Sequence, residues 1–416
     1  MSIYLKDRLD RIFYFKVSHG DRLYNVLSKN HIPIDAVMVS KDGELIDDYM
    51  EIYDEKHEYV INMVRAYHLP DFLTYLGLWD YDVNTFEPGE YSYYTKRYAN
   101  HDEANGDFLY NITNFGKAEF LKYIEDMFVE GCYEAKLFNE NEPVLLALSG
   151  GRDSQSLGYL LRRNEDRLPK ITLSAVHVET SSNKLETSYA KSIANSFNFP
   201  IQVYTDEQVG QLFNLKTSIH DALNKIKNDF NRSYSIFSAH NIIKACVERH
   251  AAQVGVNKII YGLMNEDVAV SIVKGTFIGM PFRGPLKRNY GKFELIYPLW
   301  PITKKELTLY LELVNRQHNL QGSPSTYERG ALSRDIYYFI VDTLETICPG
   351  IIYQLIEATK NASQNFYKPV QYVNCVNCGT TYTRDYDIPS DETMVRSEGL
   401  CDLCNMFNNF NLIKGC

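Results

Sequence analysis

Long apolar runs are absent from the sequence: no stretch approaches the roughly eighteen consecutive apolar residues that a membrane-spanning helix needs. The first residues, MSIYLKDRLDRIF, carry charges where a secretory signal peptide needs an apolar segment. Positive charge is scarce, because 43 Lys and Arg face 53 Asp and Glu, a net charge of -10. We therefore expect a cytoplasmic chain without a membrane partner, in which a nucleic-acid partner needs a local basic patch.

Glycine and proline are also too few, at 23 and 14 of 416 residues, for a long disordered tract. Hydrophobic residues make up 45% of the chain and charged residues 23%, as in a globular protein. A chain of this length exceeds one ordinary core, so two or three domains are expected.

The GxxxxGK[ST] phosphate loop is missing, but a different glycine loop lies in residues 143–161, PVLLALSGGRDSQSLGYLL. Five apolar residues, 144–148, predict a buried strand, and an apolar helical pattern follows the loop. Gly150 and Gly151 allow backbone N–H groups to close around a phosphate, while the next helix points its positive end at the charge. A phosphate site is therefore predicted here.

Polar side chains of this loop add to the predicted site. Ser149 and Ser154 supply hydroxyl donors, and Asp153 can cap the helix or position a metal ion. The alternative is a plain turn, because Gly and Ser form turns in many proteins. The order of apolar strand, SGGRDS and apolar helix favours the phosphate loop.

Strands and helices alternate after this loop. Strands are predicted at 171–178, 201–204 and 258–261, with helices at 117–134, 185–196 and 238–253. This alternation predicts a doubly wound parallel sheet, in which ligands bind at the carboxyl ends of the strands.

The first eighty residues predict a small α+β unit. Strands are expected at 2–5, 12–17, 36–40, 44–46 and 58–64, and a helix at 22–29. The order resembles the ubiquitin-like β-grasp fold of the sulfur carriers, with IPIDAVMVSKDGELI as the central hairpin. Those carriers act through a free terminal Gly-Gly, whereas this chain continues. The unit is therefore predicted to be structural or to dock a sulfur carrier or other protein partner.

Four of the eight cysteines form two CxxC pairs separated by 22 residues: Cys375, Cys378, Cys401 and Cys404. Two such pairs present four thiolates tetrahedrally, which predicts a structural Zn²⁺ site without an open position for catalysis. Paired disulfides are the alternative, which a cytoplasmic location disfavours.

The SGGRDS loop resembles that of the PP-loop ATP pyrophosphatases, whose SGGxDS motif binds ATP and whose reaction places AMP on a carbonyl or carboxylate oxygen. The resemblance implies a HUP-type α/β domain over 117–365, after a β-grasp domain at 1–80 and a linker at 81–116, and before a zinc ribbon at 366–416. It implies that ATP is bound by Ala147, Ser149, Gly150, Gly151, Asp153, Ser154, Ala175, Val176, His177 and Gly262, with residues 175–177 beside the adenine.

The same resemblance implies catalytic roles for Asp153 and Ser154, and an acidic residue near the triphosphate and Mg²⁺ in the loop GLMNED. Asp267 is the first choice and Glu266 the second, and either one can instead cap a helix. Positive charge for the departing pyrophosphate is sought in GMPFRGPLKRNYGKF, at Arg283, Lys287, Arg288 and Lys292, with a solvated basic hairpin as the alternative.

Residues 297–352 and the CVNCG and LCDLCNMF segments resemble the tRNA 2-thiouridine synthetase branch of that family. That branch carries Cys-x-x-Cys-Gly before the Gly262 strand and a Cys before Pro. Ungapped matching places Tyr234, Phe237 and Ser238 at the first site and Ser323 at the second. Cys246 and Cys348 are then the candidate sulfur nucleophiles, with buried structural cysteines as the alternative.

The resemblance implies adenylation followed by sulfur insertion into a tRNA uridine, another nucleobase or a small-molecule amide. Nitrogen insertion is the alternative, as in the 7-cyano-7-deazaguanine synthases, which share SGGxDS and a four-cysteine zinc site and have relatives in antiphage modification. A third possibility is a nucleotide-sensing binding protein without catalysis, and the intact Asp153 and Ser154 argue against it.

Overall fold

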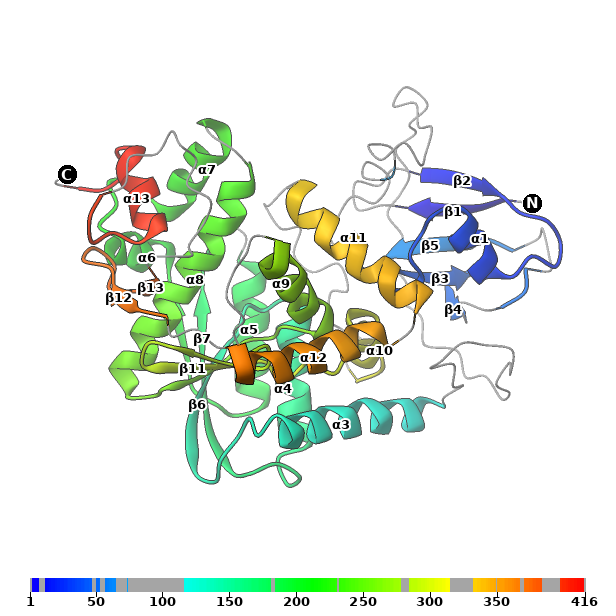
Figure 1. Ribbon diagram of the computed structural model, residues 1–416, viewed down its shortest axis with the longest axis horizontal. Coiled ribbons are helices and arrows are strands. Elements are labelled where there is room, and N and C mark those ends of the chain that lie inside the picture. Colours follow the sequence, from blue (N-terminus) through cyan, green and yellow to red (C-terminus); the bar gives the residue numbers. More distant parts are fainter. Residues whose placement is uncertain are drawn as a thin grey trace.

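The computed structural model describes residues 2–6, 12–46, 50–52, 57–64, 73, 116–180, 184–229, 232–277, 284–314, 332–348, 350–366, 370–383 and 397–414. These residues form an N-terminal sheet unit, a central sheet with helices on both faces, and a C-terminal two-stranded ribbon with one helix. The N-terminal unit and the ribbon lie at opposite ends of the long axis (Figure 1).

The N-terminal unit is a mixed sheet with the strand order β2-β1-β5-β3-β4. Its elements are β1 (Ser2–Lys6), β2 (Ile12–Lys16), α1 (Leu23–Lys29), η1 (Ile34–Ala36), β3 (Val37–Lys41), β4 (Glu44–Ile46) and β5 (Tyr59–Met63). The central strands β1 and β5 run parallel, with Leu5 opposite Ile61, and all other pairs are antiparallel. Leu23 and Leu27 of α1 are fully buried and pack on the same core as Leu5 and Ile61.

The central sheet has the order β10-β11-β9-β6-β7-β8. Its strands are β6 (Glu142–Ala147), β7 (Ile171–Val178), β8 (Ile201–Tyr204), β9 (Lys258–Ile260), β10 (Lys287–Tyr290) and β11 (Phe293–Ile296). All neighbours are parallel except β10 and β11, which form an antiparallel hairpin at one edge. The inner strands β6 and β9 are buried on both faces over most of their length, as expected for strands with apolar runs in a parallel sheet.

Helices cover both faces of this sheet. Leu145 and Ala147 of β6 join one core with α6 (Asp206–Leu212), α7 (Ile219–Asp229) and α8 (Arg232–Val254). Val144 and Leu146 point to the other face and join a second core with α3 (Lys117–Glu134), α4 (Arg152–Arg163), α5 (Leu185–Ser196) and α10 (Lys304–Val314). Alternate residues of one strand therefore enter opposite cores, because successive side chains point to opposite faces.

The remaining helices extend the structure beyond the sheet. They are α9 (Asn265–Phe277), α11 (Leu332–Ile347) and α12 (Ile351–Phe366), which share a core around Trp300, and α13 (Asp402–Asn409) beside the ribbon strands β12 (Tyr372–Asn374) and β13 (Thr381–Thr383). Figure 1 shows α11 between α9 and the N-terminal sheet. No single helix among the described residues passes the length and apolarity test for a membrane span, and one pair, Ile336–Ile347 with Ile351–Ser363, passes only together across a sharp bend.

The predicted fold class is confirmed, with a doubly wound parallel sheet, a mixed N-terminal sheet and a C-terminal four-cysteine cluster. Helices α3 and α5 and strands β7 and β8 have the predicted bounds. Helices α6 and α7 were not predicted, although Thr205 and Gln208 form a capping box at the start of α6. The linker at 81–116 lies outside the described residues except for Gly116, the N-cap residue of α3, and the domain boundaries stay predictions.

Candidate functional site

The central sheet has a topological switch point beside β6. The chain moves from β6 to β7 and β8 on one side, and β9 pairs with β6 on the other side. In parallel α/β sheets the connections leave such a point in opposite directions, which opens a crevice at the carboxyl ends of the strands. The SGGRDS loop follows β6 and the loop with Gly262 follows β9, so both loops lie at this crevice.

Gly150 is required by the shape of the loop. Its φ is +78°, and a Cβ atom built there would lie 2.0 Å from the carbonyl oxygen of Glu186 at the start of α5. A side chain at this position would therefore be strained and would also collide with backbone. Gly151 has an ordinary φ of -74° and is the N-cap residue of α4, where it offers no side chain to satisfy the first N–H groups of the helix.

The two serines of the loop hold it in shape. The Oγ atoms of Ser149 and Ser154 lie 3.1 Å apart, and the Ser149 Oγ also accepts a hydrogen bond from the Gly151 N–H at 3.2 Å. The Ser154 hydroxyl donates to the Gly151 carbonyl at 2.9 Å. Hydroxyls, backbone N–H groups and a helix N-terminus therefore converge within six residues, which is a donor set suited to phosphate oxygens.

The carboxylate of Asp153 is held by a lysine that the sequence reasoning missed. The Lys304 ammonium donates to Asp153 Oδ2 at 2.9 Å, and only 15% of the lysine side chain is exposed. Burial lowers the pKa of Lys304 below its usual value, and the negative charge of Asp153 opposes this shift. The ion pair therefore keeps a positive charge next to the first turn of α4.

The position of Lys304 is fixed by the start of α10. Thr303 and Glu306 form reciprocal hydrogen bonds. The Thr303 N–H donates to the Glu306 carboxylate at 2.9 Å, and the Glu306 N–H donates to the Thr303 Oγ1 at 3.2 Å. The buried Glu266 accepts the Lys304 backbone N–H with both carboxylate oxygens, at 2.9 and 3.1 Å. The Thr-x-x-Glu spacing was a sequence signal for this helix start, but not for its approach to Asp153.

The GLMNED loop approaches the SGGRDS loop closely. A Cβ atom built on Gly262 would lie 3.7 Å from the Ser154 nitrogen and 3.8 Å from the Asp153 carbonyl group. Asp267 accepts from the Met264 N–H at 3.1 Å and from the Tyr338 hydroxyl at 2.5 Å. Asp267 thus caps α9, and Glu266 caps α10, and both lie in the first turn of α9. Their carboxylates have the oxygen chemistry that Mg²⁺ prefers.

The predicted adenine residues lie at the carboxyl half of β7. Ala175 and Val176 are buried in opposite cores, and Ala147 pairs with Val176 in register. His177 is also buried, and its ring nitrogens contact the Leu148 carbonyl at 2.9 Å and the Thr187 Oγ1 at 3.0 Å. Burial lowers the pKa of His177, so the ring is neutral at neutral pH. Adenine binding by these residues stays a prediction.

The basic residues sought for the pyrophosphate lie elsewhere or outside the described residues. Lys287 belongs to β10, donates to the Lys136 carbonyl at 2.9 Å and pairs with Glu294 at 3.4 Å. Glu294 also pairs with Lys258, the first residue of β9, at 3.0 Å. The Lys287 charge therefore lies toward the amino end of β9, whereas the SGGRDS loop lies at the carboxyl ends of the strands. Arg288 is in the same hairpin and Lys292 stacks on Phe293, so the hairpin alternative describes these residues. Arg283 lies outside the described residues.

The cysteine candidates have different environments. Cys246 on α8 is fully buried, and burial raises the pKa of its thiol, as for a structural cysteine. Cys348 is exposed and follows α11.

The residues that stand at the cysteine positions of the thiouridine branch are placed in part. Tyr234 and Phe237 lie on α8, where Ser238 is buried and donates to the Met406 sulfur at 3.5 Å. Ser323 lies outside the described residues, and a sulfur-relay role for Cys348 stays a prediction.

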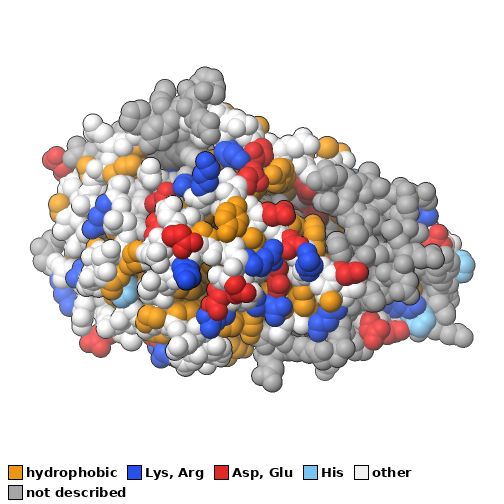
Figure 2. Space-filling model, turned by 90° about the horizontal axis from the view of Figure 1, so that it is seen from below, with side chains coloured by type: hydrophobic (Ala, Val, Ile, Leu, Met, Phe, Trp, Pro, Cys, Tyr) orange, Lys and Arg blue, Asp and Glu red, His pale blue; other side chains and the backbone are white. Residues whose placement is uncertain are grey.

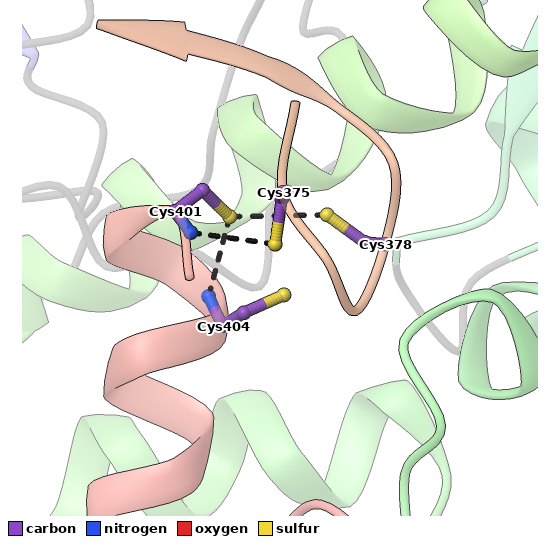
Figure 3. Close-up of side chains that lie close together, drawn as sticks. All are labelled: Cys375, Cys378, Cys401 and Cys404. Carbon is purple, nitrogen blue, oxygen red and sulfur yellow. Dashed lines mark hydrogen bonds between the residues drawn. The ribbon is translucent and has the colours of Figure 1, made fainter. Parts of the chain in front are cut away.

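The four cysteines of the ribbon converge on one point, shown in Figure 3. Their sulfur atoms all lie within 4.8 Å of one another, and those of Cys378 and Cys401 are 3.8 Å apart. A tetrahedral ion with metal–sulfur bonds of about 2.3 Å separates its ligands by about 3.8 Å. A disulfide needs about 2.05 Å, and the four are free thiols, so the disulfide alternative is wrong.

The cluster is built to carry negative charge on sulfur. The Cys375 sulfur accepts the Cys401 N–H at 3.3 Å, and the Cys404 sulfur accepts the Asn377 side-chain amide at 3.3 Å. Hydrogen bonds from neighbouring thiols lower the pKa of Cys375, whereas donation to Cys375 raises the pKa of Cys401. All four can be thiolates together only when a cation neutralises them, so the cluster fits a metal ion.

Comparisons with known proteins agree with this geometry. No family model matches the chain. The chain is similar to the tRNA(Ile)-lysidine synthase of Thermotoga maritima, with 21% identity over 229 residues, 54% of this chain and 51% of the relative. It therefore spans about half the length of that enzyme. The fold resembles the U34-tRNA thiolase NcsA of Methanococcus maripaludis, at 18% identity and a TM-score of 0.54 over 73% of this chain and 92% of that one.

The sheet order, the SGGRDS loop at the switch point and these likenesses agree with the resemblance of the chain to the PP-loop ATP pyrophosphatases. The enzymes that it resembles include a tRNA-lysidine synthase and a tRNA thiolase.

Proposed function

We propose that this chain is an ATP-dependent adenylating enzyme that places AMP on a carbonyl or carboxylate oxygen and then replaces that oxygen. One observation carries the proposal: the SGGRDS loop lies at the switch point of the sheet, with Asp153 held at 2.9 Å by Lys304. A triphosphate needs donors, positive charge and a place for Mg²⁺, and this constellation offers all three.

The residues divide this work by their chemistry. The N–H groups at residues 150–152 and the Ser149 and Ser154 hydroxyls hold phosphate oxygens. Lys304 neutralises charge on the departing pyrophosphate. Asp153 and Asp267 would hold Mg²⁺, which supplies further charge neutralisation on the phosphates when bound. A metal ion is needed there because two carboxylates beside a triphosphate would otherwise repel it.

The reaction balances in two steps. In the first, the acceptor oxygen attacks the α-phosphorus, the bond to the bridging oxygen breaks, and pyrophosphate leaves. In the second, a nucleophile adds to the acceptor carbon, and AMP leaves with the former carbonyl oxygen. A hydrosulfide nucleophile gives the thiocarbonyl product directly, and its proton goes to solvent. A thiocarboxylate nucleophile first gives an acyl–sulfur adduct, and water then cleaves the acyl–sulfur bond to release the carboxylate and the thiocarbonyl product.

Sulfur insertion is the leading second step, in keeping with the fold shared with a tRNA thiolase. The buried Cys246 does not suit a persulfide carrier, which leaves the exposed Cys348, free sulfide or a partner thiocarboxylate as the sulfur source. Nitrogen insertion is the second candidate, since ammonia needs no cysteine, and Ser323 stands where the thiouridine branch has a cysteine.

The acceptor is a nucleobase, in tRNA or in a small molecule. The two relatives carry tRNA in their names, which supports a tRNA acceptor. Charge supports a small one: the net charge is -10, and Figure 2 shows Lys and Arg interspersed with Asp and Glu across the described part of one face. The ribbon with Cys375, Cys378, Cys401 and Cys404 is proposed to hold a structural Zn²⁺.

Product analysis tests this proposal. The chain is incubated with Mg·ATP and either bulk tRNA or free nucleobases, with sulfide or ammonia in parallel. We expect AMP and pyrophosphate in equal amounts with the correct acceptor, and mass spectrometry of that acceptor separates sulfur from nitrogen insertion. Production of ADP and phosphate would contradict adenylation, and ATP binding without turnover on any acceptor would favour the nucleotide sensor. Asp153→Asn is the matched inactive variant.

A further inference from the structure

The N-terminal unit, defined here as β1–β5 with α1 and η1, contacts the catalytic domain beside three groups of the candidate site. We propose that this unit is a positioning element of the active site, which acts through Arg152, Lys305 and Tyr338 on Asp153, Lys304 and Asp267. The inference rests on the proposed function for the roles of Asp153, Lys304 and Asp267, and on the following contacts for its geometry.

Arg152 links the unit to the SGGRDS loop. Its guanidinium Nη2 donates to the Val64 carbonyl at 3.3 Å, directly after β5, and its Nε lies 3.7 Å from Asp153 Oδ1. The arginine side chain is only 9% exposed. Val64 is in turn fixed to the unit, because its N–H donates to the Ala36 carbonyl at 2.9 Å. The variable residue of the SGGxDS motif is therefore a tether in this chain.

Lys305 makes the second link. Its ammonium donates to the Ile34 carbonyl of η1 at 3.2 Å, and it is the neighbour of Lys304 in the first turn of α10. The Ile34 N–H donates to the Thr346 hydroxyl of α11 at 3.2 Å in a buried contact. Main-chain groups of η1 thus bond to two helices of the catalytic domain, which fixes the start of α10 relative to the unit.

Tyr338 makes the third link. Its ring packs against the core of the N-terminal unit, and its hydroxyl donates to Asp267 Oδ1 at 2.5 Å. Because Asp267 also accepts the Met264 N–H, the two contacts fix both carboxylate oxygens. Figure 1 shows the helix that carries Tyr338, α11, between the N-terminal sheet and α9.

The interface is apolar as well as hydrogen-bonded. Met38 and Val64 of the unit are buried in the core formed by α3, α4, α5 and α10, and Phe339 packs into the core of the unit. Interfaces between domains are usually more polar, and relative motion is then the default. A shared apolar core instead makes the unit a fixed support. Support of this kind matters because a displacement of about 1 Å at a reacting group can cost about 10²-fold in rate.

The first test measures Mg·ATP binding by calorimetry as a function of Mg²⁺ concentration. Tyr338→Phe removes the hydroxyl contact with Asp267, and Tyr337→Phe on the same helix is the control. We expect Tyr338→Phe to raise the Mg²⁺ concentration for half-maximal ATP binding by roughly threefold or more, with the control like the parent. Equal Mg²⁺ dependence in all three proteins would overturn the Tyr338 link.

The second test needs no nucleotide, so it still applies if the parent fails to bind Mg·ATP and the proposed function falls. Hydrogen–deuterium exchange of residues 148–156 is compared in the full chain without ligand. Arg152→Ala should exchange faster there, Arg152→Lys should restore part of the protection, and Arg162→Ala at the end of the same helix should match the parent. Unchanged exchange in Arg152→Ala would refute the tether.

Discussion

The ammonium of Lys304 lies 2.9 Å from Oδ2 of Asp153, which joins the first turn of α10 to the first turn of α4 across 151 residues of sequence. The pair sets the electrostatics of the site, because it brings a cation to a helix start that already attracts anions. Its acid is in the SGGRDS loop, and its base has a pKa lowered by burial.

Lys304→Met should lower pyrophosphate release by about 10²-fold, because one charged donor to the leaving group is lost. The fold should persist, since burial already disfavours the lysine charge. Steady-state product formation and a melting curve check both statements. A variant with the parent's rate would remove Lys304 from the mechanism.

The same variant gives a pH-dependent difference in stability. The pKa of Lys304 is lowered from its usual 10.5, so between the lowered pKa and 10.5 the unfolded chain binds more protons than the folded one. The parent should therefore gain stability relative to Lys304→Met as pH rises through that window. Denaturant unfolding of both proteins at several alkaline pH values measures the difference, and a relative loss of stability would contradict the assignment.

His177 should make the stability of the fold depend on pH on the acidic side. Burial lowers its pKa below the usual 6.5, so the unfolded chain gains protons first as the pH falls below 6.5. The parent should lose stability on acidification more steeply than His177→Gln. Parallel unfolding curves between neutral and mildly acidic pH test this, and equal slopes would mean that the ring is protonated in the fold.

Gly150→Ala and Gly255→Ala form a matched pair for the loop backbone. Both positions have positive φ, +78° and +72°, so each alanine carries a left-handed strain of about 1–2 kcal/mol. Only at Gly150 does the added Cβ also meet backbone, at 2.0 Å from the Glu186 carbonyl oxygen, whereas Gly255 has open space. Gly150→Ala should therefore lose clearly more unfolding free energy than Gly255→Ala, and an equal loss would show that the loop can relax.

Cys401→Ser should remove the metal and destabilise the ribbon, because three thiolates cannot complete a tetrahedral site. Metal content by mass spectrometry and the melting temperature report this directly. Cys348→Ser, at an exposed position outside the cluster, is the control for metal content. Zinc content equal to the parent's in Cys401→Ser would contradict the site.

The sequence was informative where the chemistry is local. The SGGRDS residues, the cysteine spacing and the alternating strands are short-range patterns, and each is found where it was predicted. Lys304 was missed because its approach to Asp153 depends on how α10 packs against α4. The basic segment at 279–293 was interpreted as a mobile loop or a hairpin, and within its described part the pairing of β10 with β11 shows the hairpin.

Docking of the N-terminal unit was beyond sequence reasoning for the same reason. Arg152 stands at the variable position of the SGGxDS motif, where no residue type is required, and its partner Val64 is 88 residues away. Tyr338 similarly reaches Asp267 over 71 residues. Contacts of this kind become visible only when the packing of whole elements is known.

Titration of Mg·ATP into the parent and Gly151→Ala tests the loop most directly. The φ of -74° accepts alanine, and the added Cβ meets only the Ser149 Oγ at 3.3 Å, so the fold should tolerate it. Its methyl group would still lie at the helix start where the phosphate binds. We predict one bound nucleotide in the parent and in Gly255→Ala. Binding to Gly151→Ala should be at least roughly tenfold weaker, which corresponds to a loss of about 1.4 kcal/mol of binding free energy. No binding in the parent, or equal binding in all three, would contradict a phosphate site in the SGGRDS loop.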